Sequence, residues 1–180
     1  MSIVLVGSTS GSITLQEPAV AGTTVLNLPA VSGTIVTTGS PQSGSVLQVV
    51  QGTQSGAGST SSTSFTSTGL TATITPKFST SKILCILSLS ARANSANGGA
   101  FTLFRGTTSG TDLSNSSNSQ GFGDIVVSYY VPLVASILDN PATTSAVTYT
   151  AAVRNFPSAT TVAWSANGAY STLTLMEIAA

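Results

Sequence analysis

Apolar residues in the first part of the chain come in short bursts, at 3–6, 13–15, 25–28 and 35–36, separated by glycine, serine, threonine and proline. Each burst has the length of a short strand, and the residues between bursts favour turns. The segment is too small to bury a core of its own. The pattern therefore predicts short strands joined by sharp corners over residues 1–44.

The same segment repeats itself with a period of eleven residues. SITLQEPAVAG (12–22) matches TTVLNLPAVSG (23–33) position by position, with proline seventh and valine ninth after a glycine, and the match fades after residue 33. Repeats of this kind are units that bury their apolar face by stacking on copies, in the same chain or in a partner. We expect the repeated glycines and prolines to form corners used in assembly: Gly11, Gly22, Gly33, Gly44, Pro18 and Pro29.

From residue 45 onward the apolar residues alternate with polar ones in longer runs, which is typical of strands with one buried face. The alternation predicts strands near 45–51, 64–75, 82–93, 100–105, 124–138, 145–154, 160–166 and 170–178, with a break at Pro132. Helical periodicity with capping signals is absent. The chain is therefore predicted to be all-β, with an extended N-terminal arm of short repeated strands (1–44) and an antiparallel β-sandwich domain (45–180).

Charge is scarce: only 6% of the 180 residues are charged, and the net charge is zero. Ordinary soluble domains carry roughly 25% charged residues. The five basic residues all follow position 76 and are scattered singly, which does not suit a phosphate-tracking surface: Lys77, Lys82, Arg92, Arg105 and Arg154. We expect no nucleic-acid partner, and we expect the strand edges to be covered by sister chains.

Catalytic and metal-binding patterns are weak. The sequence has no histidine, the commonest general base and metal ligand. Ser79 and Lys82 have serine-x-x-lysine spacing, but that motif needs a helix and here it runs into a strand. Asp112 lies in a loop with serine and asparagine, where a surface loop is favoured over a calcium site, and the single Cys85 lies in an apolar run typical of a core thiol. The chain is predicted to be no enzyme, with no catalytic, cofactor-binding or metal-binding residues.

Two further features leave alternatives open. Tyr129, Tyr130, Trp164 and Tyr170 could form an aromatic platform for a sugar, although core or interface packing is the favoured interpretation for aromatic residues in strands. The longest apolar run, 125–138, is too short to cross a bilayer as a helix and is interrupted by serine and proline, so no membrane insertion is expected.

Several stretches resemble tailed-phage virion proteins. The segment SGSITLQEPAVAGTTVLNLPAVSGTIVTTG (10–39) resembles the N-terminal part of such proteins. TPKFSTSKILCILSLS (75–90), LDNPATTSAVTYTAAVRN (138–155) and STLTLMEIA (171–179) are similar to their C-terminal β domain. The resemblance implies a homotrimer on the virion surface, with an intertwined arm, a jelly-roll sandwich and no catalytic residues.

The chain departs from the longer members of that family in two ways, because it has no repetitive shaft and is short for a receptor-binding fibre. Both departures favour a capsid decoration (cement) protein or short head fibre, whose partners are its own copies and the phage coat protein. The alternative is a short tail fibre or spike that binds a host surface glycan.

Overall fold

The computed structural model describes residues 3–16, 19–20, 22–23, 25, 30–33, 36–94, 98–115, 121–126, 128–157, 161–166 and 168–180. The chain divides into two compact units, Met1–Ile35 and Val36–Ala180. The division falls before the predicted boundary at Gly44. Gly44 already belongs to the second unit, because its N–H donates to Ala179 O (2.8 Å).

The first unit contains an antiparallel hairpin of β1 (Ile3–Val6) and β2 (Ser12–Leu15). Its turn is closed by a hydrogen bond from Gly7 N to Gly11 O (2.9 Å). These strands match the first two apolar bursts of the sequence. The side chains of β1 are all exposed, so both faces of this strand are open among the residues that the structure describes.

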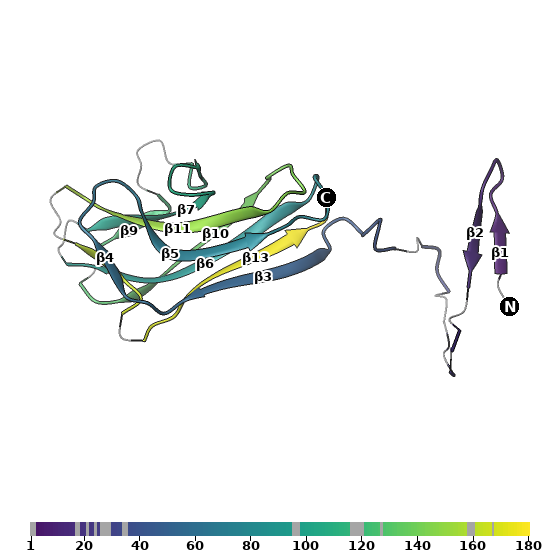
Figure 1. Cartoon of the computed structure of the whole chain (residues 1–180), viewed down its shortest axis with the longest axis horizontal. Coiled ribbons are helices and arrows are strands. Elements are labelled where there is room, and N and C mark those ends of the chain that lie inside the picture. The colour runs from purple at the N-terminus through teal and green to yellow at the C-terminus, as the bar shows by residue number, and fades with distance from the viewer. Residues whose placement is uncertain are drawn as a thin grey trace. The chain divides into compact units, whose positions relative to one another are not determined.

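The second unit is a sandwich of two antiparallel sheets (Figure 1). One sheet has the order β3–β13–β6–β12–β4, with β10 on the free side of β6, and the other has the order β5–β11–β7–β8, with β9 also on β7. The strands of the first sheet are β3 (Val46–Gln54), β4 (Gly58–Thr60), β6 (Lys82–Ala93), β10 (Val131–Asp139), β12 (Val162–Trp164) and β13 (Ser171–Ile178). Those of the second are β5 (Thr66–Ile74), β7 (Gly99–Arg105), β8 (Thr111–Asp112), β9 (Gly123–Ile125) and β11 (Val147–Asn155).

The pairing is that of a jelly roll. β12 and β13 both pair with β6, and β4 and β3 pair in turn with β12 and β13. β8 and β9 both pair with β7. Each of the pairs β3/β4, β8/β9 and β12/β13 therefore counts as one interrupted strand. The sandwich then has eight strands, in which the first pairs with the eighth, the second with the seventh, the third with the sixth and the fourth with the fifth. This nesting folds one long antiparallel ribbon into two facing sheets. It confirms the predicted jelly-roll-like antiparallel β-sandwich.

The core lies between the two sheets and follows the alternation read from the sequence. In β5, Leu70, Ala72 and Ile74 point inward, and in β13 Leu173 and Leu175 do the same. Glycine is required at one close approach of the two sheets: a Cβ on Gly52 of β3 would overlap Thr71 O of β5. The sandwich therefore has a complete core within one chain.

One buried polar cluster joins the sheets near the end of β10. The Asp139 carboxylate accepts hydrogen bonds from the Tyr149 hydroxyl (2.8 Å) and from Arg105 Nη1 (3.1 Å). Asp139 belongs to one sheet, whereas Arg105 and Tyr149 belong to the other. Burial, followed by the bond to Asp139, raises the pKa of Tyr149 above its ordinary range, so the hydroxyl stays protonated as the donor.

A second buried cluster surrounds Glu177 of β13, which is fully buried on the face it shares with Leu173 and Leu175. Its carboxylate accepts hydrogen bonds from Gln48 Nε2 (2.6 Å), the N–H of Lys77 (2.7 Å) and the N–H of Phe78 (3.4 Å). These bonds fasten the turn between β5 and β6 to the last strand.

The predicted strand 124–138 differs from the structure. It is two strands, β9 and β10, that belong to different sheets, and the chain crosses between them at 126–130 rather than breaking at Pro132. Pro132 lies inside β10, where it is tolerated because β10 is an edge strand, whose one partner among the described strands is β6. The turn-rich segments 52–64 and 106–123 also contain the short strands β4 and β8, which were not expected.

Candidate binding site

The residues considered for catalysis or metal binding, Ser79, Asp112 and Cys85, lie in surroundings that give them a role in the fold. Ser79 is exposed in a turn before β6, with no helix to bring Lys82 beneath it. The Asp112 side chain accepts hydrogen bonds from Thr102 and from Ser114 N (3.0 Å), so it organises its own loop. Burial raises the pKa of the Cys85 thiol to about 12, which keeps it protonated at neutral pH.

The four candidate platform aromatics separate into two groups. Trp164 is a core residue, with its ring against Gly58 and its Nε1 donating to Thr68 O (2.9 Å). Tyr129 and Tyr170 are exposed, at 67% and 73%, and Tyr130 is half-buried. The packing interpretation therefore holds for Trp164, and the tyrosines remain available at the surface.

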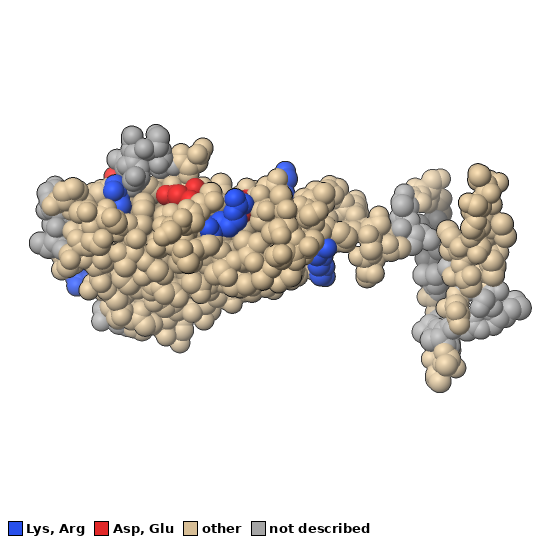
Figure 2. All heavy atoms as spheres, turned by 45° about the horizontal axis from the view of Figure 1, so that its top comes forward, with Lys and Arg blue, Asp and Glu red and all other residues tan. Residues whose placement is uncertain are grey.

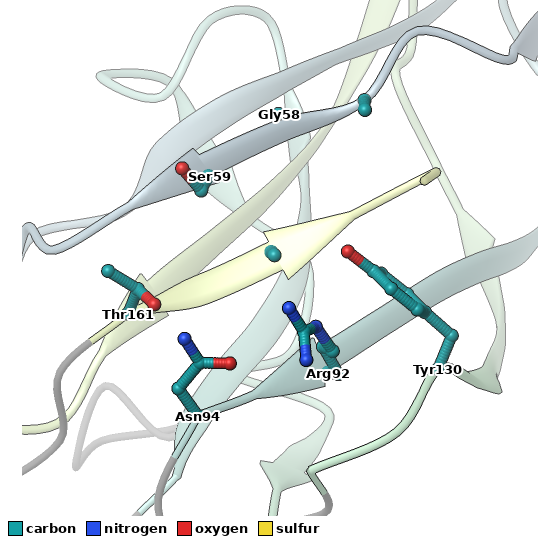
Figure 3. A pocket seen from close by; sticks show the side chains of 8 residues that line it. Gly58, Ser59, Arg92, Asn94, Tyr130 and Thr161 are labelled. Atoms are coloured by element: carbon teal, nitrogen blue, oxygen red, sulfur yellow. The ribbon is translucent and has the colours of Figure 1, made fainter. Parts of the chain in front are cut away.

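A hollow lies on the outer face of the first sheet, at the end farther from Gly44. Its floor is a row of residues in register, with Ser59 of β4 opposite Ala163 of β12 and Ala163 opposite Arg92 of β6. Ala163 is small, which leaves a space of about 370 Å³ between taller neighbours. Figure 3 shows Arg92 and Asn94 on one side of β12 and Ser59 on the other.

Tyr130 forms a wall of this hollow through its contact with Arg92. The guanidinium lies over the Tyr130 ring, 5.1 Å from its centroid, and Nη1 donates to Ser128 O (3.3 Å). These two contacts fix the guanidinium at the edge of the hollow (Figure 3). Arg92 and Tyr130 also line a second hollow of about 540 Å³, together with Ser128, Tyr129 and Ala166.

The electrostatics of the two adjoining hollows follow from their lining. Arg92 is their one charged lining residue among the residues that the structure describes. Charged side chains cover only a small part of the face shown in Figure 2. The site thus presents one fixed positive charge beside tyrosine rings, hydroxyls and an amide, a set that can bind but offers no general base.

A similar arginine lies elsewhere on the sandwich. The guanidinium of Arg154 lies between Phe65 (5.5 Å) and Phe156 (5.2 Å), beside a hollow of about 340 Å³. Its aromatic neighbours are phenylalanines, which have no hydroxyl. This site is a natural comparison for the one at Arg92.

Sequence reasoning missed Arg92. Arg92 has no other basic residue near it in the sequence, and this isolation was used only as an argument against nucleic-acid binding. Its neighbours in the hollow, Ser59, Tyr130 and Ala163, are distant along the chain. A local signal did exist, because Arg92 takes an outward position of the alternation, between the buried Ala91 and Ala93, just before a turn-rich segment.

The predicted assembly corners differ in their backbone conformation. Gly11, Gly22 and Gly44 have positive φ angles of 79°, 59° and 82°, a conformation that favours glycine. Gly33 lies outside that region of φ, so backbone strain does not explain the glycine there. Pro18 and Pro29 lie outside the described residues, and the role of all six in assembly stays a prediction.

Within the described ranges, no group of three or more acidic or cysteine side chains could hold a metal ion. No helix in that part of the chain is long and apolar enough to cross a membrane. Comparison with protein-family models gives no match to the chain, and comparison with curated proteins gives none either.

Proposed function

We propose that the chain is a non-enzymatic structural protein of a tailed-phage virion, a homotrimer that decorates the capsid surface and stiffens it by bridging coat subunits. The resemblance of the repeat and of the later β stretches to virion proteins supports the virion assignment. The jelly-roll sandwich is compatible with the fold that this resemblance implies.

The observation that carries the proposal is the exposure of apolar residues in the first unit. Ile3, Val4, Leu5, Val6 and Ile13 of the hairpin are all more than half exposed. The repeat valines Val20 and Val31 are exposed at 90% and 74%. An isolated two-stranded hairpin is at best marginally stable in water, so these residues fit a segment that is covered by sister chains or by the coat protein.

A second candidate function is a short tail fibre or spike that binds a host surface glycan. The specific observation in its favour is the pair of hollows around Arg92, with the exposed ring of Tyr129 beside them.

Two measurements test the proposal. Sedimentation equilibrium of the full-length chain should give a trimer, and a stable soluble monomer would contradict it. Quantitative mass spectrometry of purified virions should find hundreds of copies, as expected for decoration, whereas a few copies would favour the tail fibre.

A further inference from the structure

We propose that the two hollows around Arg92 form one binding site for an acidic saccharide. This inference deepens the second candidate function, and it does not depend on decoration of the capsid. The ligand class is identified by three kinds of group that the fold brings together on one face: a fixed guanidinium, an exposed tyrosine ring and neutral hydrogen-bonding side chains.

The guanidinium selects a carboxylate. Arg92 is held by Tyr130 and by Ser128 O, so it is already oriented before a ligand arrives. Its planar fork of N–H donors suits the two oxygens of a carboxylate. No carboxylate of the described residues lines either hollow, so a bound anion would meet no like charge there.

The aromatic rings select a sugar over a simple organic anion. Tyr129 lines the second hollow and exposes most of its surface, which leaves its ring open to the C–H face of a pyranose. Such rings provide apolar contact with a polar edge. A small anion such as acetate would use Arg92 and leave this ring uncovered.

The neutral groups complete the site. Ser59, Asn94 and Thr161 line the first hollow and offer both donors and acceptors to sugar hydroxyls. The small Ala163, which lies between Ser59 and Arg92 in the register of the sheet, leaves room for a ring to approach the strands. Because the two hollows share Arg92 and Tyr130, the site can hold more than one saccharide unit.

Isothermal titration calorimetry of the full-length protein tests this assignment with three probes: oligogalacturonate, monomeric galacturonic acid and neutral dextran oligosaccharide. We expect oligogalacturonate to bind and dextran not to bind at millimolar concentration. Tighter binding of the oligomer than of the monomer indicates a surface polysaccharide as the ligand source, and equal binding indicates a free sugar acid.

Variants locate the site. Arg92→Gln and Tyr129→Ala should each weaken oligogalacturonate binding at least tenfold, and Tyr129 is an exposed loop residue whose truncation preserves the core. Arg154→Gln, the matched control, should change the affinity less than twofold, because its hollow lacks the tyrosines and the amide.

Three results would overturn the inference: no binding of either acidic probe, equal binding of dextran, or equal weakening by Arg92→Gln and Arg154→Gln. The assay uses purified protein, so its failure removes the saccharide site and leaves the decoration role, which is judged by trimer formation and copy number.

Discussion

At the scale of single residues, Glu177 has the most demanding position, because a charged carboxylate is fully buried. Burial alone would raise the pKa of Glu177, but the hydrogen bonds from Gln48 and from the N–H groups of Lys77 and Phe78 lower it below the ordinary value. The folded state therefore binds this proton more weakly than the unfolded chain does. The resulting stability is present above the ordinary glutamate pKa and is lost as the pH falls through the folded value.

We predict that Glu177→Gln lowers the free energy of unfolding at pH 7 by about 1.5–3 kcal/mol, the contribution of a hydrogen bond to a charged group. The difference from the wild type should shrink at pH 3, because the carboxylate of the unfolded chain is protonated below its ordinary pKa and the stability that comes from the lowered pKa decreases there. Urea unfolding at both pH values measures this. Asp124→Asn, at an exposed carboxylate, is the control and should have little effect. A deficit of equal size at both pH values would show that packing, not charge, is lost.

At the scale of elements, the strands could be predicted well because alternation is a local property. Leu173, Leu175 and Glu177 share one face of β13 in the sequence pattern and are all buried. The partners of each strand could not be predicted. The run 125–138 is predominantly apolar over its whole length, and nothing local shows that β9 and β10 belong to different sheets.

Gly22 and Gly33 end two successive copies of the repeat in the arm, so their substitutions form a matched pair. Gly22 has φ of 59°, whereas Gly33, at the equivalent position, does not need a positive φ, and neither has an atom within 4 Å of an added Cβ. Gly22→Val should therefore cost about 1 kcal/mol or more in backbone strain. Gly33→Val should cost little.

Sedimentation velocity over a dilution series measures the effect on assembly. We expect Gly22→Val to dissociate at higher protein concentration than the wild type, with Gly33→Val close to the wild type. Equal behaviour of the two variants would mean that the corner conformation does not matter for assembly.

At the scale of the whole molecule, the division at Ile35/Val36 suggests a truncation that keeps the sandwich core intact. A chain of residues 36–180 should show the same β-rich circular dichroism as the sandwich and should fail to bind capsids. The intact protein should stay bound in 1 M salt, which screens charge pairs, because residues 1–44 carry only one charge.

Co-sedimentation with capsids lacking the protein measures both effects. Binding of the truncated chain at wild-type level, or release of the intact protein by moderate salt, would show that the arm is not the anchor.

The candidate site could not be predicted from the sequence, because its residues are distant along the chain. Ser59, Arg92 and Ala163 come together only through the register of three strands.

The jelly-roll pairing also has a mechanical consequence. The arm joins the sandwich at the start of β3, and the hollow around Arg92 lies at the other end of the same sheet. A load applied between an anchored arm and a ligand at that hollow runs along the strands, perpendicular to their hydrogen bonds, and must shear many bonds together. A pull on the C-terminus against the arm would instead separate β13 from β3 one pair at a time. The sandwich is thus stiff along the strand axis that joins the start of β3 to the hollow around Arg92.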